Sequence, residues 1–178
     1  AAPYLLIVQH PVTSEIGHAG RQIGETLKAV KATGLAGVVV YPNHAAGYSA
    51  IARGIKGSAI RWFKSFPPDV FANVLRYSSA LVGNSSTGIH ETATFRVPTV
   101  NVGTRQDGRE RPGNVIDVGY EAREIRRGIE RALYDPKFRH RLARVTNPYG
   151  DGKAALRIVR ILKRLDLSRV PIQKRFFD

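Results

Sequence analysis

Short apolar runs alternate with amphipathic stretches along most of the chain, and this rhythm restricts the fold more than any other feature of the sequence. The first run, 4–8 (YLLIV), ends at the polar pair Gln9 and His10. A continuous run of this length is typical of a strand buried on both faces of a parallel sheet. We predict further strands at 37–41, 59–64, 79–83, 97–102 and 114–118.

The stretches between these runs predict helices. The first is expected to have Thr13 or Ser14 as its N-cap and to end at Gly34. Others are expected at 48–56, from Pro67 onward, after 84–88, and near 121–134, 136–143 and 152–165. Strands and helices in alternation imply βαβ units with right-handed crossovers. We therefore predict an α/β fold: a single three-layer, Rossmann-like domain over 1–178, with a six-stranded parallel sheet and helices on both faces.

The composition excludes several classes of site. The chain has 178 residues and no Cys, so disulfides, thiolate metal sites and Cys nucleophiles are ruled out. Its apolar runs are too short to span a bilayer and no signal-peptide pattern opens it, so we expect a soluble, cytoplasmic protein with no membrane partner. It also has no Met, not even an initiator, and we expect it to be a piece of a longer protein.

The chain is strongly basic, with 28 Lys and Arg against 14 Asp and Glu and a net charge of +14. The excess is concentrated in 121–178, which holds 16 basic and 7 acidic residues. A basic nucleic-acid-binding module is therefore the alternative of a different class. However, Arg123, Arg126 and Arg127 alternate with glutamates, a spacing that gives local ion pairs. We favour a solvated helical face, or a face docked on an acidic partner, and predict no nucleic-acid ligand.

Ligands of an open parallel sheet bind outside the carboxyl ends of its strands, so the residues that follow each strand are the candidates for a site. The segment 84–88 (NSSTG) places three hydroxyls at a strand-to-helix turn. Helix-start N–H groups and serine hydroxyls can hold a phosphate, although an ordinary serine N-cap is an equally good interpretation. Neither a Walker loop nor Gly-x-Gly-x-x-Gly is present. We predict no cofactor, and no metal, since no His, Asp or Glu group has metal-ligand spacing.

Eight segments along the chain match one family. They are 9–13 (QHPVT), 41–43 (YPN), 82–91 (VGNSSTGIHE), 97–106 (VPTVNVGTRQ), 108–110 (GRE), 114–119 (NVIDVG), 149–154 (YGDGKA) and the closing 172–178 (IQKRFFD). Together they resemble the hydrolysing UDP-N-acetylglucosamine 2-epimerases. The resemblance implies one half of a glycosyltransferase-B type fold, in which two Rossmann-like domains face each other across a cleft. This chain would be the second, nucleotide-binding half, and its partner would be the absent N-terminal domain of the same enzyme.

The resemblance assigns UDP contacts to four positions. Ser85 and Ser86 would hold the diphosphate, together with backbone N–H groups of the following helix. Glu91 would accept hydrogen bonds from two ribose hydroxyls, as a carboxylate with two oxygens can; without a ligand it is an ordinary acidic residue near a helix start. The backbone around Phe66 would read the edge of the uracil.

Three further residues are assigned to the sugar and the leaving group. Asn43 would line the cleft near the sugar or phosphates, and Arg105 would meet diphosphate or sugar oxygens with its planar guanidinium. His10, which ends the first strand, would be catalytic and donate to the departing phosphate oxygen, either as imidazolium or as a neutral donor. A lone His beside a strand is more often a structural hydrogen-bond donor. The family often has Arg where this chain has His90, which predicts a weaker cationic contact near the phosphates.

The resemblance also implies a reaction. UDP leaves the sugar by elimination across C1–C2, and water adds to the glycal to give N-acetylmannosamine, a sialic acid precursor, and UDP. The carboxylates that serve C2 would lie in the absent domain, so we expect this chain to bind UDP and UDP-N-acetylglucosamine weakly and to be inactive alone. The alternatives are a non-hydrolysing epimerase and half of a UDP-sugar glycosyltransferase. A homo-oligomer is compatible with the sequence. The link 57–60 is shorter than the family suggests by roughly ten residues, although short links are common in such folds.

Overall fold

The computed structural model describes residues 2–166, 168 and 173. The chain forms two compact units, Ala1–Pro148 and Tyr149–Asp178. Of the closing segment 172–178, which contributes to the family resemblance, all but Gln173 lies outside the described residues.

The first unit contains a six-stranded, wholly parallel sheet in the order β3-β2-β1-β4-β5-β6. This confirms the predicted sheet, and the order is the one typical of Rossmann folds. Each strand begins or ends within three residues of its predicted bounds. The strands are β1 (Tyr4–Val8), β2 (Ala36–Val40), β3 (Arg61–Phe63), β4 (Ala80–Gly83), β5 (Thr99–Val102) and β6 (Val115–Val118).

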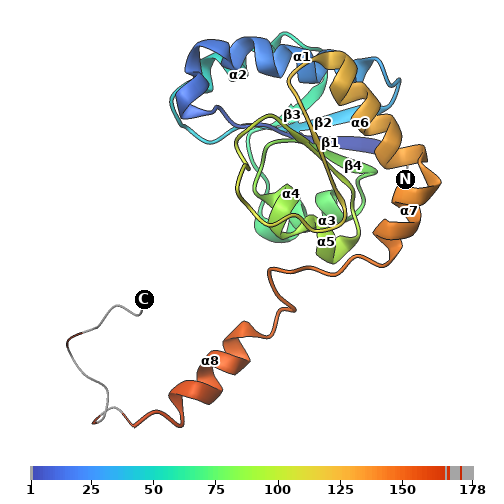
Figure 1. The fold of residues 1–178 in the computed structure, drawn as a ribbon. Coiled ribbons are helices and arrows are strands. Elements are labelled where there is room, and N and C mark those ends of the chain that lie inside the picture. Colours follow the sequence, from blue (N-terminus) through green and yellow to red (C-terminus); the bar gives the residue numbers. More distant parts are fainter. Residues whose placement is uncertain (1, 167, 169–172, 174–178) are drawn as a thin grey trace. The chain divides into compact units, whose positions relative to one another are not determined.

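Helices cover both faces of the sheet, as predicted (Figure 1). One face packs against α1 (Ala19–Lys31), α2 (Tyr48–Lys56), α6 (Ala122–Tyr134) and α7 (Pro136–Ala143). The opposite face packs against α3 (Pro68–Arg76) and α5 (Thr92–Phe95), beside the short α4 (Thr87–His90).

The central strand β1 shows why its sequence is apolar without interruption. Leu5 and Ile7 belong to the core under the first set of helices, whereas Leu6 and Val8 belong to the core under the second. All four side chains are at most 4% exposed. Burying one such side chain stabilises the fold by about 1.5–3 kcal/mol, so both faces of this strand contribute to holding the three layers together.

The first predicted helix begins differently in the structure. Residues Thr13–His18 form a 3-10 segment with non-helical angles at Glu15, and α1 starts only at Ala19. Neither Thr13 nor Ser14 is a cap. The N-cap of the 3-10 segment is Val12 and that of α1 is His18, and neither forms a side-chain capping hydrogen bond. Both carboxylate oxygens of Glu15 accept hydrogen bonds, from Gln22 and Thr104 at 2.6 Å each. This tertiary contact explains why the local helix signal was wrong here.

The short link 57–60 between α2 and β3 forms a tight turn. Ser58 donates to the Ile55 carbonyl at 2.7 Å, and its hydroxyl oxygen accepts the Ile60 N–H at 3.2 Å. Ala59, between them, adopts a left-handed conformation with φ of 60°. Four residues therefore suffice to turn the chain, at the cost of one strained alanine.

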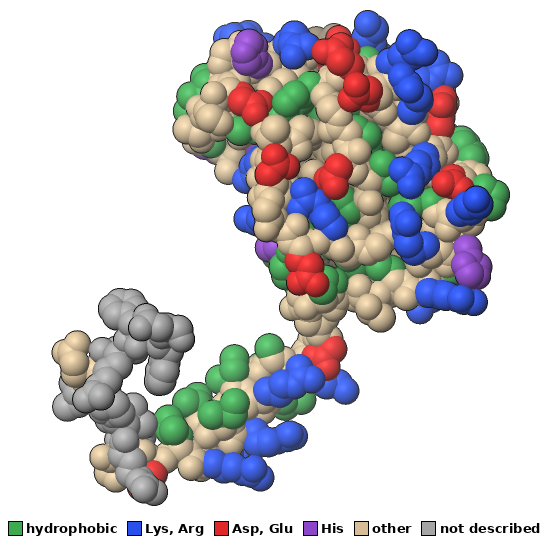
Figure 2. Space-filling model, viewed as in Figure 1, with side chains coloured by type: hydrophobic (Ala, Val, Ile, Leu, Met, Phe, Trp, Pro, Cys, Tyr) green, Lys and Arg blue, Asp and Glu red, His purple; other side chains and the backbone are tan. Residues whose placement is uncertain are grey.

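The second unit contains α8 (Ala154–Leu162). The helix carries apolar side chains on one side and Arg or Lys on the other (Figure 2). Near its start, Arg157 forms two hydrogen bonds of 2.8 Å with the Asp151 carboxylate, and these hold the pKa of that carboxyl at about 2. None of the helices in the described residues is long and apolar enough to cross a membrane.

Candidate functional site

The candidate site lies where the sheet changes direction. The chain moves outward from β1 to β3 on one side and from β4 to β6 on the other. Ligands of such sheets bind in the crevice outside the carboxyl ends of the two strands at this switch point. Here Val8 of β1 pairs with Gly83 of β4, so the loops that follow these two strands lie side by side.

Two glycines shape the turn after β4. Gly83 has φ of +132°, and a Cβ there would lie 2.2 Å from the Val8 carbonyl oxygen. A Cβ on Gly88 would lie 2.6 Å from the Thr99 Cγ2 atom. The first glycine therefore permits the close approach of β4 to the end of β1, and the second permits α4 to pack closely on β5. Close helix–strand packing is also the purpose of one glycine in dinucleotide-binding turns.

Asn84 joins three of the loops at this edge of the sheet. Its side-chain oxygen accepts the His10 backbone N–H at 2.7 Å, and its side-chain nitrogen donates to the His10 carbonyl at 2.9 Å. Its own carbonyl accepts from Arg105 Nη1 at 3.0 Å and from Gln106 Nε2 at 2.7 Å. Asn84 is fully buried. The loops after β1, β4 and β5 are thus held in one arrangement by a single residue.

His10 is a neutral imidazole in this arrangement. Its Nδ1 accepts the Asn43 backbone N–H at 3.1 Å, so its proton resides on Nε2. Burial, and after it the positive charge of Arg105, lower the pKa of His10 to about 4, while a side-chain hydrogen bond with Asn43 acts in the opposite direction. Of the two forms that the resemblance allows, the structure favours the neutral donor at neutral pH.

The lowered pKa of His10 predicts an acid-dependent loss of stability. His10 of the unfolded chain binds a proton below pH 6.5, whereas His10 of the folded chain binds one only below about pH 4. The free energy of unfolding therefore falls as the pH falls through this window. Compared with His10→Asn, whose amide oxygen can still accept the Asn43 N–H, we expect an extra loss of about 2 kcal/mol between pH 7 and about pH 4.5. Denaturant unfolding at both pH values measures it. Equal losses would contradict the prediction.

Arg105 belongs to the loop after β5, and Arg111 holds this loop in place through several contacts. Arg111 donates to the carbonyls of Gln106 at 2.6 Å and Arg109 at 2.7 Å. It also contacts the Asp117 carboxylate at 3.2 Å. Burial lowers the pKa of Arg105, and the positive charge of Arg109 lowers it further. Arg105 is therefore a partly desolvated cation close enough to His10 to affect its pKa.

A hollow of about 730 Å³ opens at this edge of the sheet, within the range of small-molecule sites. The loops after β5 and β2 line it on two sides, with Arg105 and Asn43, and the rest of the wall is the segment after His10. Its lining residues are Pro11, Val12, Thr13, Ser14, Asn43, Ala45, Thr104 and Arg105. A guanidinium and several hydroxyls in one concavity suit an anionic, hydroxyl-rich ligand.

The two serines of the turn use their hydroxyls differently. Ser85 is buried, and its oxygen accepts the Thr87 N–H at 3.3 Å. Ser86 is the N-cap residue of α4 and forms no side-chain capping bond. Because α4 has only four residues, its dipole is short, and the serine hydroxyls and Arg105 are the stronger candidates for holding a phosphate.

Two predicted residues stand apart from this group. Phe66, in the loop after β3, is half-buried with its ring 4.7 Å from that of Phe63. Glu91 is exposed between α4 and α5. Within the described part of the chain, neither of them forms a hydrogen bond, ion pair or ring contact with His10. Near Glu91, Arg109 Nη1 lies 3.1 Å from His90 Nε2, so a guanidinium does reach the position where the family often has Arg.

Sequence reasoning missed Glu15 and Asn84. Hydrogen bonds from Thr104 and Tyr120 are the main causes that lower the pKa of Glu15, so it is a positioning acceptor rather than a base. No sequence signal links it to Thr104, 89 positions away. Asn84 carried a weak signal, since an amide directly after a buried strand must satisfy its hydrogen bonds there. The part of the chain that the structure describes contains no group of three His, Asp or Glu residues able to hold a metal ion.

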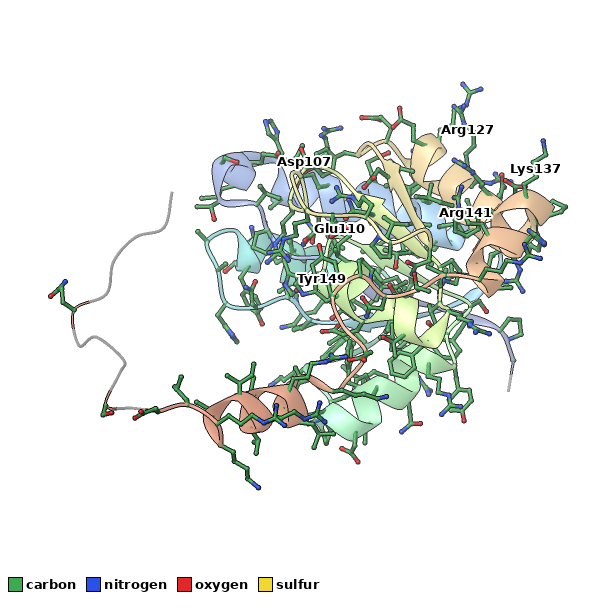
Figure 3. The ribbon with its side chains drawn as sticks, turned by 60° about the horizontal axis from the view of Figure 1, so that its bottom comes forward. Asp107, Glu110, Arg127, Lys137, Arg141 and Tyr149 are labelled. Carbon is green, nitrogen blue, oxygen red and sulfur yellow. The ribbon has the colours of Figure 1, made fainter. Side chains whose placement is uncertain are left out.

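The basic excess is distributed over the surface. Figure 2 shows acidic side chains among the basic ones on one face of the first unit. On α6, Arg126 pairs with Glu130 at 2.8 Å, and Arg131 with Asp135 at 3.6 Å, as the alternating pattern predicted. Figure 3 shows Arg127 and Lys137 projecting outward from α6 and α7, away from Asp107 and Glu110 on the loop between β5 and β6.

Comparisons with known sequences agree on one family. The family model described as UDP-N-acetylglucosamine 2-epimerase matches residues 1–163. A curated relative from Legionella pneumophila, named UDP-N,N'-diacetylbacillosamine 2-epimerase (hydrolyzing), is 36% identical over 173 residues, which are 95% of this chain and 45% of the relative. The chain spans about half the length of the curated relatives that it matches over nearly all of its own length.

Solved structures show the same fold. The complex of S. aureus MnaA with UDP has a TM-score of 0.68 and 25% identity, and the match covers 92% of this chain and 45% of that one. The UDP-GlcNAc 2-epimerase from Neisseria meningitidis bound to UDP-GlcNAc has a TM-score of 0.75 at 20% identity, with the same coverage of both chains. The second match supports the Rossmann-like, glycosyltransferase-B type half alone.

Proposed function

The chain belongs to the UDP-N-acetylglucosamine 2-epimerase family, and we propose that residues 1–178 form the UDP-binding half of such an enzyme. The observation that carries the proposal is the hydrogen bonding of Asn84, which fixes His10 and Arg105 at the switch point of the sheet. The hollow beside them supplies the space for the sugar and phosphates.

The diphosphate is proposed to bind between the Ser85 and Ser86 hydroxyls and the Arg105 guanidinium. Arg105 already donates one N–H to the Asn84 carbonyl, which orients its planar group and leaves further donors for phosphate oxygens. Asn43 donates its backbone N–H to His10 and lines the hollow together with Arg105. The ribose and uracil are proposed to reach Glu91 and the backbone near Phe66.

Glu91→Ala is expected to weaken UDP binding by about 1–3 kcal/mol, because hydrogen bonds from the ribose hydroxyls to a charged carboxylate are lost. Titration calorimetry with UDP measures the change. Glu130→Ala is the matched control: its carboxylate pairs with Arg126 on α6, and the substitution should leave UDP affinity unchanged. Equal UDP affinity for Glu91→Ala and the unsubstituted chain would refute the ribose assignment.

The proposed reaction is hydrolytic epimerisation. A base removes the C2 proton, the C1–O bond breaks to release UDP, and water then returns a proton to C2 and a hydroxyl to C1. The products are N-acetylmannosamine and UDP. The name of the Legionella pneumophila relative specifies hydrolysis, which supports this outcome over the non-hydrolysing one.

We propose that this chain supplies the leaving-group side and lacks the base. His10 offers a neutral N–H donor at Nε2 for the departing phosphate oxygen. Glu15 has both oxygens occupied and a lowered pKa, and Glu91 is assigned to the ribose. As the family resemblance implies, we assign the carboxylate that serves C2 to the absent N-terminal half of the enzyme.

The test measures UDP release by this chain and by a full-length protein that contains it, with UDP-N-acetylglucosamine and UDP-N,N'-diacetylbacillosamine as substrates. The proposal predicts that only the full-length protein releases UDP together with a free sugar, which is N-acetylmannosamine when UDP-N-acetylglucosamine is the substrate. Formation of a UDP-linked product instead would show a non-hydrolysing enzyme. Turnover by this chain at a similar rate would show that the base lies within it.

The basic surface is proposed not to be a nucleic-acid site. Its arginines are partly neutralised by ion pairs along α6, so binding to random duplex should be only non-specific, with a Kd of about 10⁻⁴–10⁻⁶ M near physiological salt. Fluorescence anisotropy with a labelled duplex measures it. Submicromolar binding at that salt concentration would contradict the proposal.

A further inference from the structure

A second hollow lies at the opposite end of the sheet. It has a volume of about 460 Å³ and is lined at the amino ends of β1, β4 and β5, where Pro3, Ser79 and Pro98 contribute to its wall. The junction of α6 and α7 closes it with Tyr134 and Arg139. Figure 1 shows the start of the chain beside this junction. The hollow is therefore separate from the switch point, which is at the carboxyl ends of the strands.

Three arginines line this hollow. They are Arg76, Arg96 and Arg139, and no Asp or Glu is among the described lining residues. Within the described part of the chain, none of the three forms an ion pair. Arg76 stacks over the Tyr77 ring at 5.6 Å, a contact that leaves its N–H groups available. Three guanidinium groups in one concavity favour an oxyanion with several acceptor oxygens.

The backbone of Arg96 supplies a second, independent observation. Arg96 ends α5 with φ of 55° and ψ of 36°, a left-handed conformation. Glycine is the residue that best suits this position at a helix end, and a side chain there is strained. Ala59 adopts the same conformation in a tight link, so the strain alone assigns no role; at Arg96 it accompanies a guanidinium that lines the hollow. The helix dipole assigns no role to Arg96 either, because α5 has only four residues.

The remaining wall of the hollow is largely apolar. Phe95, Val97 and Leu133 line it together with the ring of Tyr134, which is 70% exposed. An inorganic ion would leave this surface in contact with water, whereas a ligand with an apolar body would cover it. The lining therefore suits a phosphate monoester that carries an aromatic or aliphatic group.

We propose that this hollow is a second ligand site, which binds a small organic phosphate through Arg76, Arg96 and Arg139. The apolar body of this ligand lies against Phe95 and Tyr134. The proposal does not depend on the proposed function, since the site shares no residue with the hollow at the switch point.

The test is a titration of the 178-residue chain with phenyl phosphate, followed by amide NMR shifts. We expect the amides of 76–79 and 95–97 to shift, with those of Gln9, His10, Val12 and 84–88 unmoved, and inorganic phosphate to bind at least about tenfold more weakly. Shifts confined to Gln9, His10, Val12 and 84–88, or no binding up to about 10 mM, would overturn the proposal. Equal affinity for inorganic phosphate would overturn the assigned apolar body.

Two glycine variants separate the charge from the backbone. Arg96→Gly removes the guanidinium and the strain together, so we expect at least tenfold weaker phenyl phosphate binding with a Tm that is equal or higher. Ala59→Gly is the matched control, because it relieves the same left-handed conformation (φ of 60°) outside the hollow and should leave binding unchanged. Arg139→Gln should also weaken binding severalfold. Unchanged binding by Arg96→Gly would overturn the proposal.

Discussion

Replacing His10 by alanine in a full-length protein that contains this chain is expected to lower kcat by about 10²–10⁴-fold, the usual contribution of one acid–base residue. The imidazole is held in one orientation, because its Nδ1 accepts the Asn43 N–H and its backbone is bonded to Asn84. In the proposed reaction, Nε2 would then be a preorganised donor to the departing phosphate. UDP affinity should change far less, because Arg105 and the two serines remain.

The control for this variant is His140→Ala, which removes an exposed imidazole in the last turn of α7. Steady-state kinetics and UDP calorimetry on both variants separate catalysis from binding. A kcat for His10→Ala within threefold of the unsubstituted enzyme would contradict the assigned role. A loss of UDP affinity as large as the loss of kcat would show that His10 acts in ground-state binding instead.

Gly83→Ala should be the most destabilising single substitution at the site, with a loss of about 4 kcal/mol or more in the free energy of unfolding. A Cβ at this position would lie 2.2 Å from the Val8 carbonyl oxygen and 2.7 Å from its carbon, both of them backbone atoms of the central strand. Neither strand can move away without breaking the β1–β4 pairing. Urea denaturation followed by circular dichroism measures the loss.

Gly34→Ala separates the clash from the backbone conformation. Gly34 also has a positive φ, of +73°, but a Cβ there meets nothing within 4 Å. Its substitution should therefore cost only the left-handed conformation, about 1–2 kcal/mol. Similar losses of unfolding free energy for Gly83→Ala and Gly34→Ala would contradict the close approach of β4 to β1 at Gly83.

The sheet could be predicted from the sequence because a strand buried on both faces is apolar at every position. Leu5 to Val8 show this most clearly, with alternate residues in two separate cores. Each predicted strand is followed by polar, proline or glycine residues, and those residues are also the ones that parallel order gathers at one edge. The positions of His10, Ser85 and Arg105 near a common edge followed from the same argument.

The parts that could not be predicted depend on contacts between distant residues. Thr13 and Ser14 satisfy every local rule for a helix cap, yet Glu15 bonds Thr104, which lies 89 positions away, and the helix starts later. Asn84 is similar: its sequence neighbours do not reveal that His10 and Arg105 are its partners. Local propensity contains no information on such pairs. The tautomer of His10 depends on another of them, the hydrogen bond from the Asn43 N–H to Nδ1.

The central claim is that the switch point between β1 and β4 binds UDP, and calorimetric titration of this chain with UDP and then with ADP tests it most directly. The account predicts a UDP Kd tighter than ~1 mM, equivalent to about −4 kcal/mol. It also predicts at least about tenfold weaker binding of ADP, because adenine lacks the edge that the backbone near Phe66 would recognise and one hydrogen bond is worth about that ratio. Equal affinities for UDP and ADP, or no heat with UDP at millimolar concentrations, would contradict the account.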